Sequence, residues 1–533
     1  MASTASSGVR TVKQPAPSSA SDDTSKLDAA VIKSTLSFLI WPMLLLAPPL
    51  LLSVQLPKIL LYGGGALIGL MLLVRSFKSP ETLLAVALVY IPLARVFPAT
   101  ILPGINGTNL TLLMLMFFWV YHAFQRNTSI WRTVPGTTPM LIWAFLSILS
   151  GLTVVFYIGL AYLIGYVPLE FKAWIDMFIV YFAFVNLIAD GRMARRVAVY
   201  MLVGSFIVLV LGVQEMLEKA GLDSLEKSRV LGPQMQPNDF GAFLVYVASI
   251  LVAIVAIKPF EVRRWWLLPW LAVIAKVLLA TFSRGAYLAL GASVAAMTWF
   301  RGLRYVVLAI LLLALIVSQF PQLVPSSLRD RMAQTTVQGT HTEQIDASSQ
   351  TRLILWDAAI KMTVESPFLG KGFKAFQYFK GRYTSVDVHE SDTHNMFLFV
   401  SSQMGIPALI SFLATLACLF GFGYAVWRKA GDGFARSLGL AGIGMSGAVV
   451  VINMFGSRMV NIEVCAYVWV FLAVLGHLFA ELQVPTARKV RAGRNETAGA
   501  TNTELEIAPS TTVETTLSVR KATKRQSSGG VRK

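Results

Sequence analysis

Apolar runs of about 20 residues recur along most of the sequence, and short charged breaks separate them. Each run is long enough to cross a hydrocarbon core about 30 Å thick as a helix. The runs are continuous and do not alternate with polar residues, which excludes a transmembrane β-barrel. Charged residues make up 14% of the 533 residues, against about 25% in a soluble globular protein. The sequence therefore predicts an all-α, polytopic helical integral membrane protein.

The runs predict about 12–14 transmembrane helices and one long extracytoplasmic loop. The boundaries are least defined for 80–95 and for the two runs on either side of Arg284. The predicted spans are 36–54, 59–75, 80–95, 108–125, 139–160, 172–189, 195–216, 240–257, 265–282, 285–300, 303–319, 397–427, 437–454 and 462–482.

Charge in the breaks predicts how the helices are oriented. The rule that positive charge stays inside puts basic breaks, and with them both termini, in the cytoplasm. The net charge of +18 is then largely a topology signal and needs no nucleic acid partner. The basic breaks alternate along the chain: Arg75/Lys78, Arg126/Arg132, Arg192/Arg195/Arg196, Lys258/Arg263/Arg264, Arg301/Arg304 and Arg428/Lys429/Arg436.

Composition divides the chain into five parts. The leader 1–35 and the basic tail 485–533 are polar and rich in Ser and Thr, so we expect both to be disordered and cytoplasmic. Between them we expect an N-terminal transmembrane bundle at 36–319, an external loop at 320–396 and C-terminal transmembrane helices at 397–484.

The external loop contains a predicted amphipathic helix at 350–365, with Leu353, Trp356 and Ile360 on one stripe. Such a helix suits a lid or platform on the membrane surface, although simple packing against the bundle would give the same pattern. A loop of this length inside a compact membrane protein is usually functional.

Three titratable or charged residues stand at places on the external side where charge is costly. Arg284 lies in "TFSRGA" between two apolar runs, Arg229 lies in "KSRVLGPQMQPND", and His394 lies just before the run that begins at 397. An arginine at the bilayer centre costs roughly 2.5–3.5 kcal/mol on insertion scales. The simpler alternatives are an arginine that reaches to lipid phosphate, a solvated loop charge and an interfacial histidine.

Neighbouring polar residues could cap helices or complete a site. Asn238 could cap the span that begins near 240, and Asn395 could cap the span that follows His394. Asp392 or Glu390 could orient the His394 ring.

Two arginines and a histidine on one membrane face suit a particular chemistry. Guanidinium groups hold phosphate through paired, charge-assisted bonds. A neutral imidazole can accept a proton from a hydroxyl. Together they fit glycosyl transfer from a polyprenyl-diphosphate sugar. No CxxC or HExxH spacing occurs, so we expect no metal and no cofactor.

The order of several short motifs resembles the O-antigen ligase and O-antigen polymerase superfamily. The matching pieces are "SRVLGPQMQPNDFGAFL" at 228–244, "TFSRGA" at 281–286, "TRLILWDAAIKMTVESPFLGKGF" at 351–373 and "THNMFLFVSSQMGIPALI" at 393–410. The resemblance covers roughly residues 200–430. The long ends of this chain and about two additional spans depart from the compact members.

The resemblance implies roles for particular residues. It implies that His394 activates an acceptor hydroxyl and that Arg229 and Arg284 bind a lipid diphosphate. Arg352 matches another family arginine. Arg352, Asp392, Asn395 and Asn238 are candidates for substrate-binding or orienting roles.

The resemblance also implies a reaction and a place. It implies a metal-independent, inverting transfer from an undecaprenyl-diphosphate-linked glycan, at the periplasmic face of the bacterial inner membrane. The expected partners are this donor, a hydroxyl acceptor and membrane lipids. The acceptor could be lipid A core (a ligase), a growing glycan (a polymerase) or a protein (an oligosaccharyltransferase).

Two other classes of function remain open at the level of sequence. Outward arginines could bind a transported small anion, but a transporter typically shows paired halves with broken helices, and no clear internal repeat is seen. A structural membrane scaffold would not need the charged cluster of the long loop.

Overall fold

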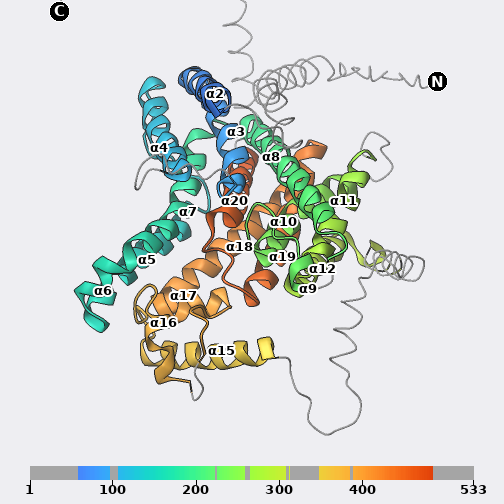
Figure 1. The fold of residues 1–533 in the computed structure, drawn as a ribbon. Coiled ribbons are helices and arrows are strands. Elements are labelled where there is room, and N and C mark those ends of the chain that lie inside the picture. Colours follow the sequence, from blue (N-terminus) through green and yellow to red (C-terminus); the bar gives the residue numbers. More distant parts are fainter. Residues whose placement is uncertain are drawn as a thin grey trace, which may run out of the picture. The chain divides into compact units, whose positions relative to one another are not determined.

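The apolar runs form helices that pack into a bundle (Figure 1). The computed structural model describes residues 58–96, 106–222, 225–257, 265–305, 307, 311, 347–384 and 388–483. No strand occurs among these residues. The predicted leader, the tail, the span 36–54 and most of the span 303–319 lie outside the described residues. The predicted all-α class and polytopic helical architecture are confirmed.

The part of the chain that precedes the long loop in sequence forms the first set of helices. They are α2 (Lys58–Lys78), α3 (Pro80–Tyr90), η1 (Ile91–Leu93), α4 (Gly107–Gln125), α5 (Thr137–Tyr157), α6 (Leu160–Gly165), α7 (Val167–Leu187), α8 (Gly191–Glu218), α9 (Leu225–Ser228), α10 (Pro237–Ile257), α11 (Leu267–Ala280) and α12 (Arg284–Arg301).

The rest of the chain supplies the long-loop elements and three long helices. They are α15 (Ala347–Glu365), α16 (Phe376–Phe379), η4 (Lys380–Arg382), α17 (Met396–Met404), α18 (Ile406–Lys429), α19 (Gly433–Met454) and α20 (Ile462–Gln483).

Seven described helices are long and apolar enough to cross a membrane, namely α4, α5, α8, α10, α18, α19 and α20. The expected 12–14 spans exceed this set. Helices α3 and α11 are apolar but short, and α7 carries the charged residues Glu170, Lys172 and Asp176. Lys172 offsets Asp176 through an ion pair of 2.5 Å one turn away.

One predicted span is wrong in its continuity. The run 397–427 is two helices, α17 and α18, and not one. The break falls at Gly405, whose φ of +88° lies in the left-handed region that interrupts a helix. Apolar periodicity alone did not predict it, because the hydrophobic pattern continues across the break.

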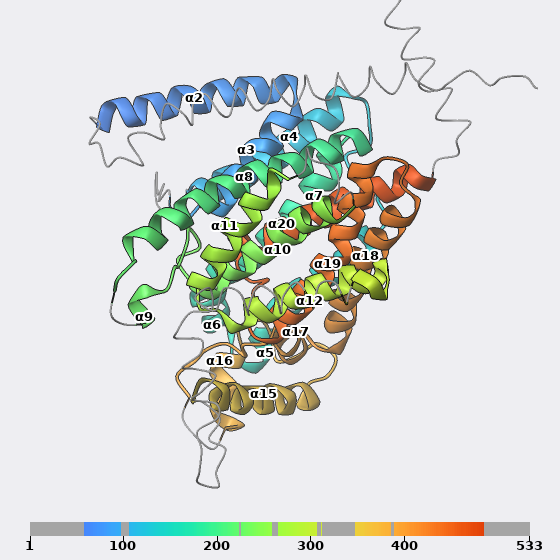
Figure 2. The same ribbon diagram turned by 90° about the vertical axis from the view of Figure 1, so that its right-hand side faces the viewer.

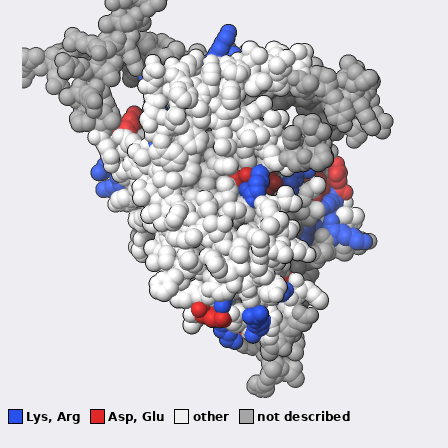
Figure 3. Space-filling model, turned by 90° about the vertical axis from the view of Figure 1, so that its left-hand side faces the viewer, with Lys and Arg blue, Asp and Glu red and all other residues white. Residues whose placement is uncertain are grey.

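The core of the bundle lies around α10, α19 and α20, which are the most buried of the spanning helices. Helix α19 packs against α10, α12 and α18. Its buried face includes the small residues Gly439, Gly442 and Gly444, which allow helix axes to approach closely. Figure 3 shows a broad outer surface without charged side chains, as expected for a surface in contact with lipid.

The predicted basic breaks meet at one end of the bundle. Arg195 pairs with both Asp432 and Glu481, and Arg196 pairs with Glu81. These residues lie at three of the basic breaks and at the end of the last span, which the sequence predicts to share a membrane side.

The opposite ends of the helices carry the predicted external segments. There, Arg458 pairs with Asp239 and Arg95 pairs with Glu463. The alternation of breaks is therefore present in the fold, while the assignment of either end to the cytoplasm stays a prediction.

The predicted loop helix 350–365 is present as α15, which lies across the external end of the bundle (Figures 1 and 2). Its buried face is formed by Leu355, Ala359 and Met362, while Leu353 and Ile360 are about half exposed. Helix α15 packs against α17. Packing of α15 against the bundle is thus confirmed. Contact of the exposed Leu353 and Ile360 with the membrane surface stays a prediction.

Two backbone segments, 367–372 and 402–406, fasten the long loop to the bundle, and we call this pair the glycine clamp. Its hydrogen bonds run from Lys371 N to Ser402 O (3.1 Å), from Gly372 N to Gln403 O (3.0 Å) and from Ile406 N to Pro367 O (2.7 Å). The clamp joins the end of α15 to the junction between α17 and α18. It thereby fixes the C-terminal end of α17, the helix that begins directly after the segment with His394.

Glycine is required in the clamp because the two backbones touch. A Cβ atom at Gly370 would lie 2.2 Å from the Gln403 carbonyl carbon, and one at Gly405 would lie 2.2 Å from the Phe368 carbonyl oxygen. Both glycines also have φ between +65° and +88°, a region that other residues rarely adopt. The motifs "FLGKGF" and "SSQMG" are therefore two halves of one contact.

Candidate functional site

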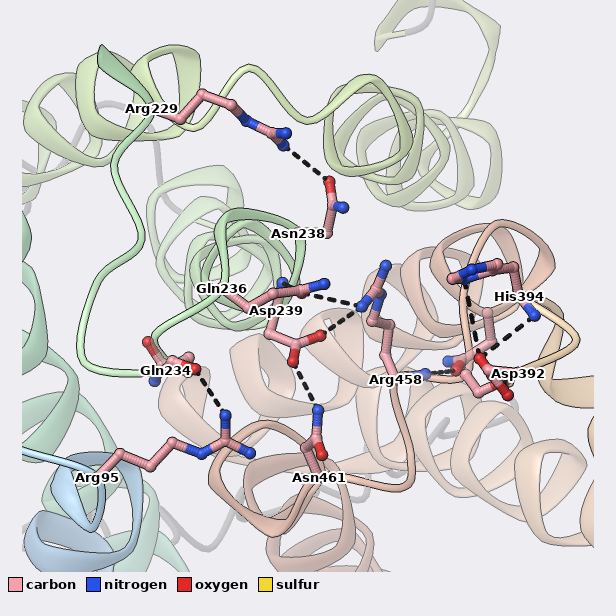
Figure 4. Close-up of polar contacts among 12 residues, drawn as sticks. Arg95, Arg229, Gln234, Gln236, Asn238, Asp239, Asp392, His394, Arg458 and Asn461 are labelled. Carbon is pink, nitrogen blue, oxygen red and sulfur yellow. Dashed lines mark hydrogen bonds and ion pairs between the residues drawn. The ribbon is translucent and has the colours of Figure 1, made fainter. Parts of the chain in front are cut away.

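Four loops come together at the end of the bundle that carries the predicted external segments (Figure 4). They are 229–236 before α10, the turn 281–283 before α12, 388–395 before α17, and 455–461 between α19 and α20. Val230 N donates to Ala280 O at 3.0 Å, which joins the first two loops. Ser457 Oγ donates to Asp392 Oδ1 at 3.0 Å, which joins the last two.

Three of these loops contain a residue other than glycine in the left-handed region. They are Met235 (φ 57°), Phe282 (φ 51°) and His394 (φ 50°). Such a conformation costs roughly 1–3 kcal/mol and is typical of functional sites, where surrounding contacts hold it. Each of the three predicted motifs in these loops contains one of these residues.

Arg229 is held at the entrance to α10 and α12. Its Nε donates to Thr281 O at 3.1 Å and its Nη2 donates to Asn238 Oδ1 at 3.4 Å. The loop after it is fixed by Glu215, whose carboxylate accepts from Leu231 N and Gly232 N. The side chain of Arg229 is half-buried, so its position is set by the loop and by its neighbours.

The prediction that Asn238 caps α10 is wrong. The helix begins one residue earlier, at Pro237, and Gln236 supplies the capping oxygen, with Asp239 N donating to Gln236 Oε1 at 3.0 Å. Proline is favoured in the first turn because it has no N–H to satisfy. Asn238 is thus available to accept a bond from Arg229 instead.

Arg284 is the first residue of α12, and its side chain is exposed. It lies three residues after Thr281, whose carbonyl oxygen accepts the hydrogen bond from Arg229. The predicted turn "TFSRGA" is confirmed, because α11 ends at Ala280 and α12 begins at Arg284.

His394 is half-buried, with Asp392 as its nearest carboxylate. His394 Nδ1 lies 3.8 Å from Asp392 Oδ2, and His394 N donates to the same oxygen at 3.3 Å. Of the two carboxylates considered from sequence, Asp392 faces the ring, while Glu390 is exposed and its carbonyl accepts from Lys380. Ser457 holds the other oxygen of Asp392.

Burial lowers the pKa of His394 below its ordinary value of 6.5. The positive charges of Arg458 and Arg352 lower it further, while Asp392 acts in the opposite direction. A lowered pKa keeps the imidazole neutral near neutral pH, which is the form that accepts a proton. The effect of Arg352 on this pKa indicates that this half-buried residue of α15 lies close enough to His394 for their charges to interact.

The prediction that Asn395 caps the following helix is confirmed. Its Oδ1 accepts from Phe397 N at 3.0 Å and from Leu398 N at 3.2 Å. This cap starts α17 directly after His394 and so sets the direction of the histidine backbone.

Arg458 also belongs to this cluster of loops, although its sequence pattern was not singled out above. Its Nη1 donates to Asp239 Oδ1 at 2.7 Å and to Gln236 Oε1 at 3.0 Å. Its side chain is 11% exposed and that of Asp239 is 3% exposed. Asn461 donates to the other oxygen of Asp239 at 2.6 Å, so this buried pair is well satisfied.

Arg458 could have been found by the argument that found Arg284. It lies in "FGSRMVN", between the predicted spans 437–454 and 462–482, on the side where the topology predicts few positive charges. Figure 4 shows it between the Arg229 side of the site and the side that carries Asp392 and His394.

No group of three or more His, Cys, Asp or Glu side chains suited to a metal ion occurs in the part of the chain that the structure describes.

Residues 270–413 match a family model described as O-antigen ligase. This chain is similar to O-antigen ligases. The predicted resemblance is thereby confirmed, and the match supports an activity of the O-antigen ligase or polymerase type in an integral membrane protein. No curated protein matches the chain.

The segment that matches the O-antigen ligase model contains only part of the candidate site. It contains Arg284, Arg352, Asp392, His394 and the glycine clamp. The matched segment also runs from α11 to the start of α18, so it carries the whole of the long loop. Arg229 and Arg458 lie outside it, and the fold brings them to the residues of the matched segment.

Proposed function

We propose that the chain is a glycosyltransferase that moves a glycan from an undecaprenyl-diphosphate donor to a hydroxyl acceptor at the membrane surface. The observation that carries the proposal is the placement of a histidine with a lowered pKa, His394, at the same end of the bundle as several arginines. The family match supports the same class of reaction.

The arginines would hold the diphosphate of the donor. Arg284 begins α12, Arg229 donates to Thr281 O in the turn just before it, and a guanidinium group can give two parallel bonds to phosphate oxygens. The isoprenoid chain would remain in the bilayer, against the apolar surface of the bundle. Arg458 is engaged by Asp239 and would act as a positioning residue that fixes the start of α10.

His394 would act as the general base. The acceptor hydroxyl transfers its proton to the neutral imidazole while its oxygen forms a bond to the anomeric carbon. The bond between that carbon and the diphosphate oxygen breaks, and undecaprenyl diphosphate leaves with the electron pair. Attack opposite the leaving group inverts the anomeric carbon. Positive charge from the arginines stabilises the departing diphosphate.

Asp392 would orient the imidazole and stabilise the imidazolium that forms. Ser457 limits the rotation of this carboxylate by holding its second oxygen. The glycine clamp and the Asn395 cap then keep the whole segment at the mouth of α17.

The proposal is tested with the purified full chain in detergent and an undecaprenyl-diphosphate oligosaccharide. Release of undecaprenyl diphosphate is measured for wild type, for His394→Ala and for His389→Ala. We expect His394→Ala to lower turnover by roughly 10²–10⁴-fold, which is the usual contribution of a general base. His389 is exposed and five positions away, so its variant is the matched control and should remain active.

Further arms separate the finer claims. Equal activity of the His394 and His389 variants would remove the general base from the proposal. The arginines are proposed to supply the charge that a metal ion could otherwise supply, so EDTA should leave the rate unchanged. A product ladder would indicate a polymerase, a single shifted acceptor a ligase, and a modified protein an oligosaccharyltransferase. Absence of release with any donor would favour anion transport.

A further inference from the structure

A cavity of about 380 Å³ lies at the end of the bundle opposite the candidate site. It is formed where α10 and α12 end, where α18 ends and where α19 begins. Helix α10 carries Asp239 in its first turn and Ile257 of the cavity at its last residue. At 1.5 Å per residue, the cavity is about 30 Å from the candidate site along this helix. Its volume lies in the range of roughly 300–1,000 Å³ that is usual for small-ligand sites.

Three arginines line the cavity, and each comes from a different helix end or following segment. They are Arg301, Arg304 and Arg436, and no acidic side chain is among its described lining residues. In the sequence, these arginines belong to two separate basic breaks. The fold brings the two breaks to one concave surface.

The guanidinium groups are positioned by neighbouring groups. Arg301 lies over the Tyr305 ring, 4.2 Å from its centroid, and also donates to Ala256 O. Arg304 lies 4.9 Å from the same centroid. Arg436 Nε donates to Trp427 O at 3.3 Å. A guanidinium has five N–H donors, so these bonds orient the groups and leave donors for a ligand oxygen.

The backbone of the cavity wall also favours an anion. Gly431 and Gly433 line it, on either side of the residue that caps α19. The cap residue, Asp432, accepts from Ala435 N and pairs with Arg195. Its carboxylate is thus engaged by Arg195 and by the backbone of α19, and the positive end of this 22-residue helix lies at the cavity wall.

We propose that this cavity binds a phosphate group, carried by an anionic phospholipid headgroup or by a soluble phosphate. Arginine clusters at helix ends recognise phosphate through charge-assisted bonds. Trp427 and Tyr305 add the amphipathic rings that are common at the level of lipid headgroups. The proposal does not rest on glycosyl transfer, because it concerns the other end of the helices.

The test uses the delipidated full chain in detergent and measures binding of three probes by native mass spectrometry and thermal unfolding. The probes are phosphatidylglycerol, phosphatidylcholine and inorganic phosphate. The test variant is Arg304→Gln with Arg436→Gln, two exposed residues whose replacement should not disturb the core. The matched control is Arg428→Gln, an exposed arginine at the same end of α18 that does not line the cavity.

We expect wild type and the Arg428 variant to bind one anionic probe, and we expect the double variant to bind it about tenfold more weakly or worse, because it loses two charge-assisted bonds. Binding of phosphatidylglycerol but not of phosphate would support a lipid source. Binding of phosphate alone would support a soluble source. If neither anion binds better than phosphatidylcholine, or if the double variant binds as well as the control, the proposal is overturned.

Discussion

Arg229 and Arg284 differ in burial. Arg229 is half-buried and bonds to Thr281 O and Asn238, and Arg284 is exposed at the start of α12. We expect Arg284→Ala to lower turnover on the order of 10²-fold through lost charge stabilisation. Arg229→Ala should lower turnover at least as much, because its loop also loses the hydrogen bonds of Arg229 to Thr281 O and Asn238.

Lysine at either position should also be impaired, because it lacks the planar fork. The measurement is release of undecaprenyl diphosphate, with Arg382→Ala as control, an exposed arginine on the same side of the bundle. An active Arg284→Ala variant would remove that residue from the diphosphate site.

The lowered pKa of His394 gives a pH dependence with a definite sign. The base acts only when neutral, so kcat/KM should stay high at pH 6.5 and fall at lower pH, below the ordinary pKa of 6.5. Because the Asp392 charge raises the pKa, Asp392→Asn should move the acid limb to still lower pH. An acid limb well above pH 6.5 in the wild type would contradict the proposed environment.

Arg458 should affect the same profile in the opposite direction. Its charge lowers the pKa of His394, so Arg458→Gln should move the acid limb to higher pH. The variant also leaves the buried Asp239 without its ion pair, which costs roughly 3–5 kcal/mol when one partner is removed.

Arg458→Lys keeps the charge and should restore the pH profile better than it restores stability. A pH–rate profile and an unfolding temperature, measured on the same preparations, separate the two effects. A stability loss in Arg458→Gln with an unmoved acid limb would make its role purely structural.

At the scale of elements, the glycine clamp is the contact most open to test. Gly405→Ala would place a Cβ 2.2 Å from the Phe368 carbonyl oxygen at a φ of +88°. We expect a loss of at least roughly 1–3 kcal/mol in unfolding free energy from the backbone conformation alone. The measurement is thermal unfolding in detergent.

Gly421→Ala in α18 is the matched control, because nothing lies within 4 Å of a Cβ there. Alanine is the better helix former by roughly 0.8–1 kcal/mol, so this variant should be neutral or more stable. Equal stability of the two variants would show that the clamp does not hold the loop.

The elements were predictable from sequence where one pattern decides them. Hydrophobic run length gave α10, α19 and α20, and helical periodicity gave α15. The break at Gly405 was missed because the backbone of Phe368, which meets it, comes from a distant segment. The cap by Gln236 was missed because glutamine is a less usual capping residue than the nearby asparagine. Of the candidate site, the sequence singled out Arg229, Arg284 and His394 as charged or titratable residues on the predicted external side, whereas Arg458 was passed over despite the same signal.

At the scale of the whole molecule, the ends of the helices are chemically distinct, and their orientation is testable. The positive-inside rule predicts that Lys429 faces the cytoplasm and that Lys361 faces outward. Both side chains are exposed. A membrane-impermeant maleimide applied to intact cells should label Lys361→Cys and not Lys429→Cys.

The native Cys418 and Cys465 lie within α18 and α20, so the unsubstituted chain serves as the background control. Labelling of the Lys429 variant in intact cells would invert the proposed orientation and place the arginine cavity outside.

The glycine clamp has a consequence for how such proteins diverge. Its hydrogen bonds join main-chain atoms. The contact therefore depends on the spacing of the two segments and on their glycines, and it does not depend on the identity of the other side chains. A related chain can therefore differ at almost every other residue of the two segments and still keep the contact that fixes the end of α17, the helix after His394. Two chains that share this geometry can look unrelated to any comparison that scores side chains one position at a time.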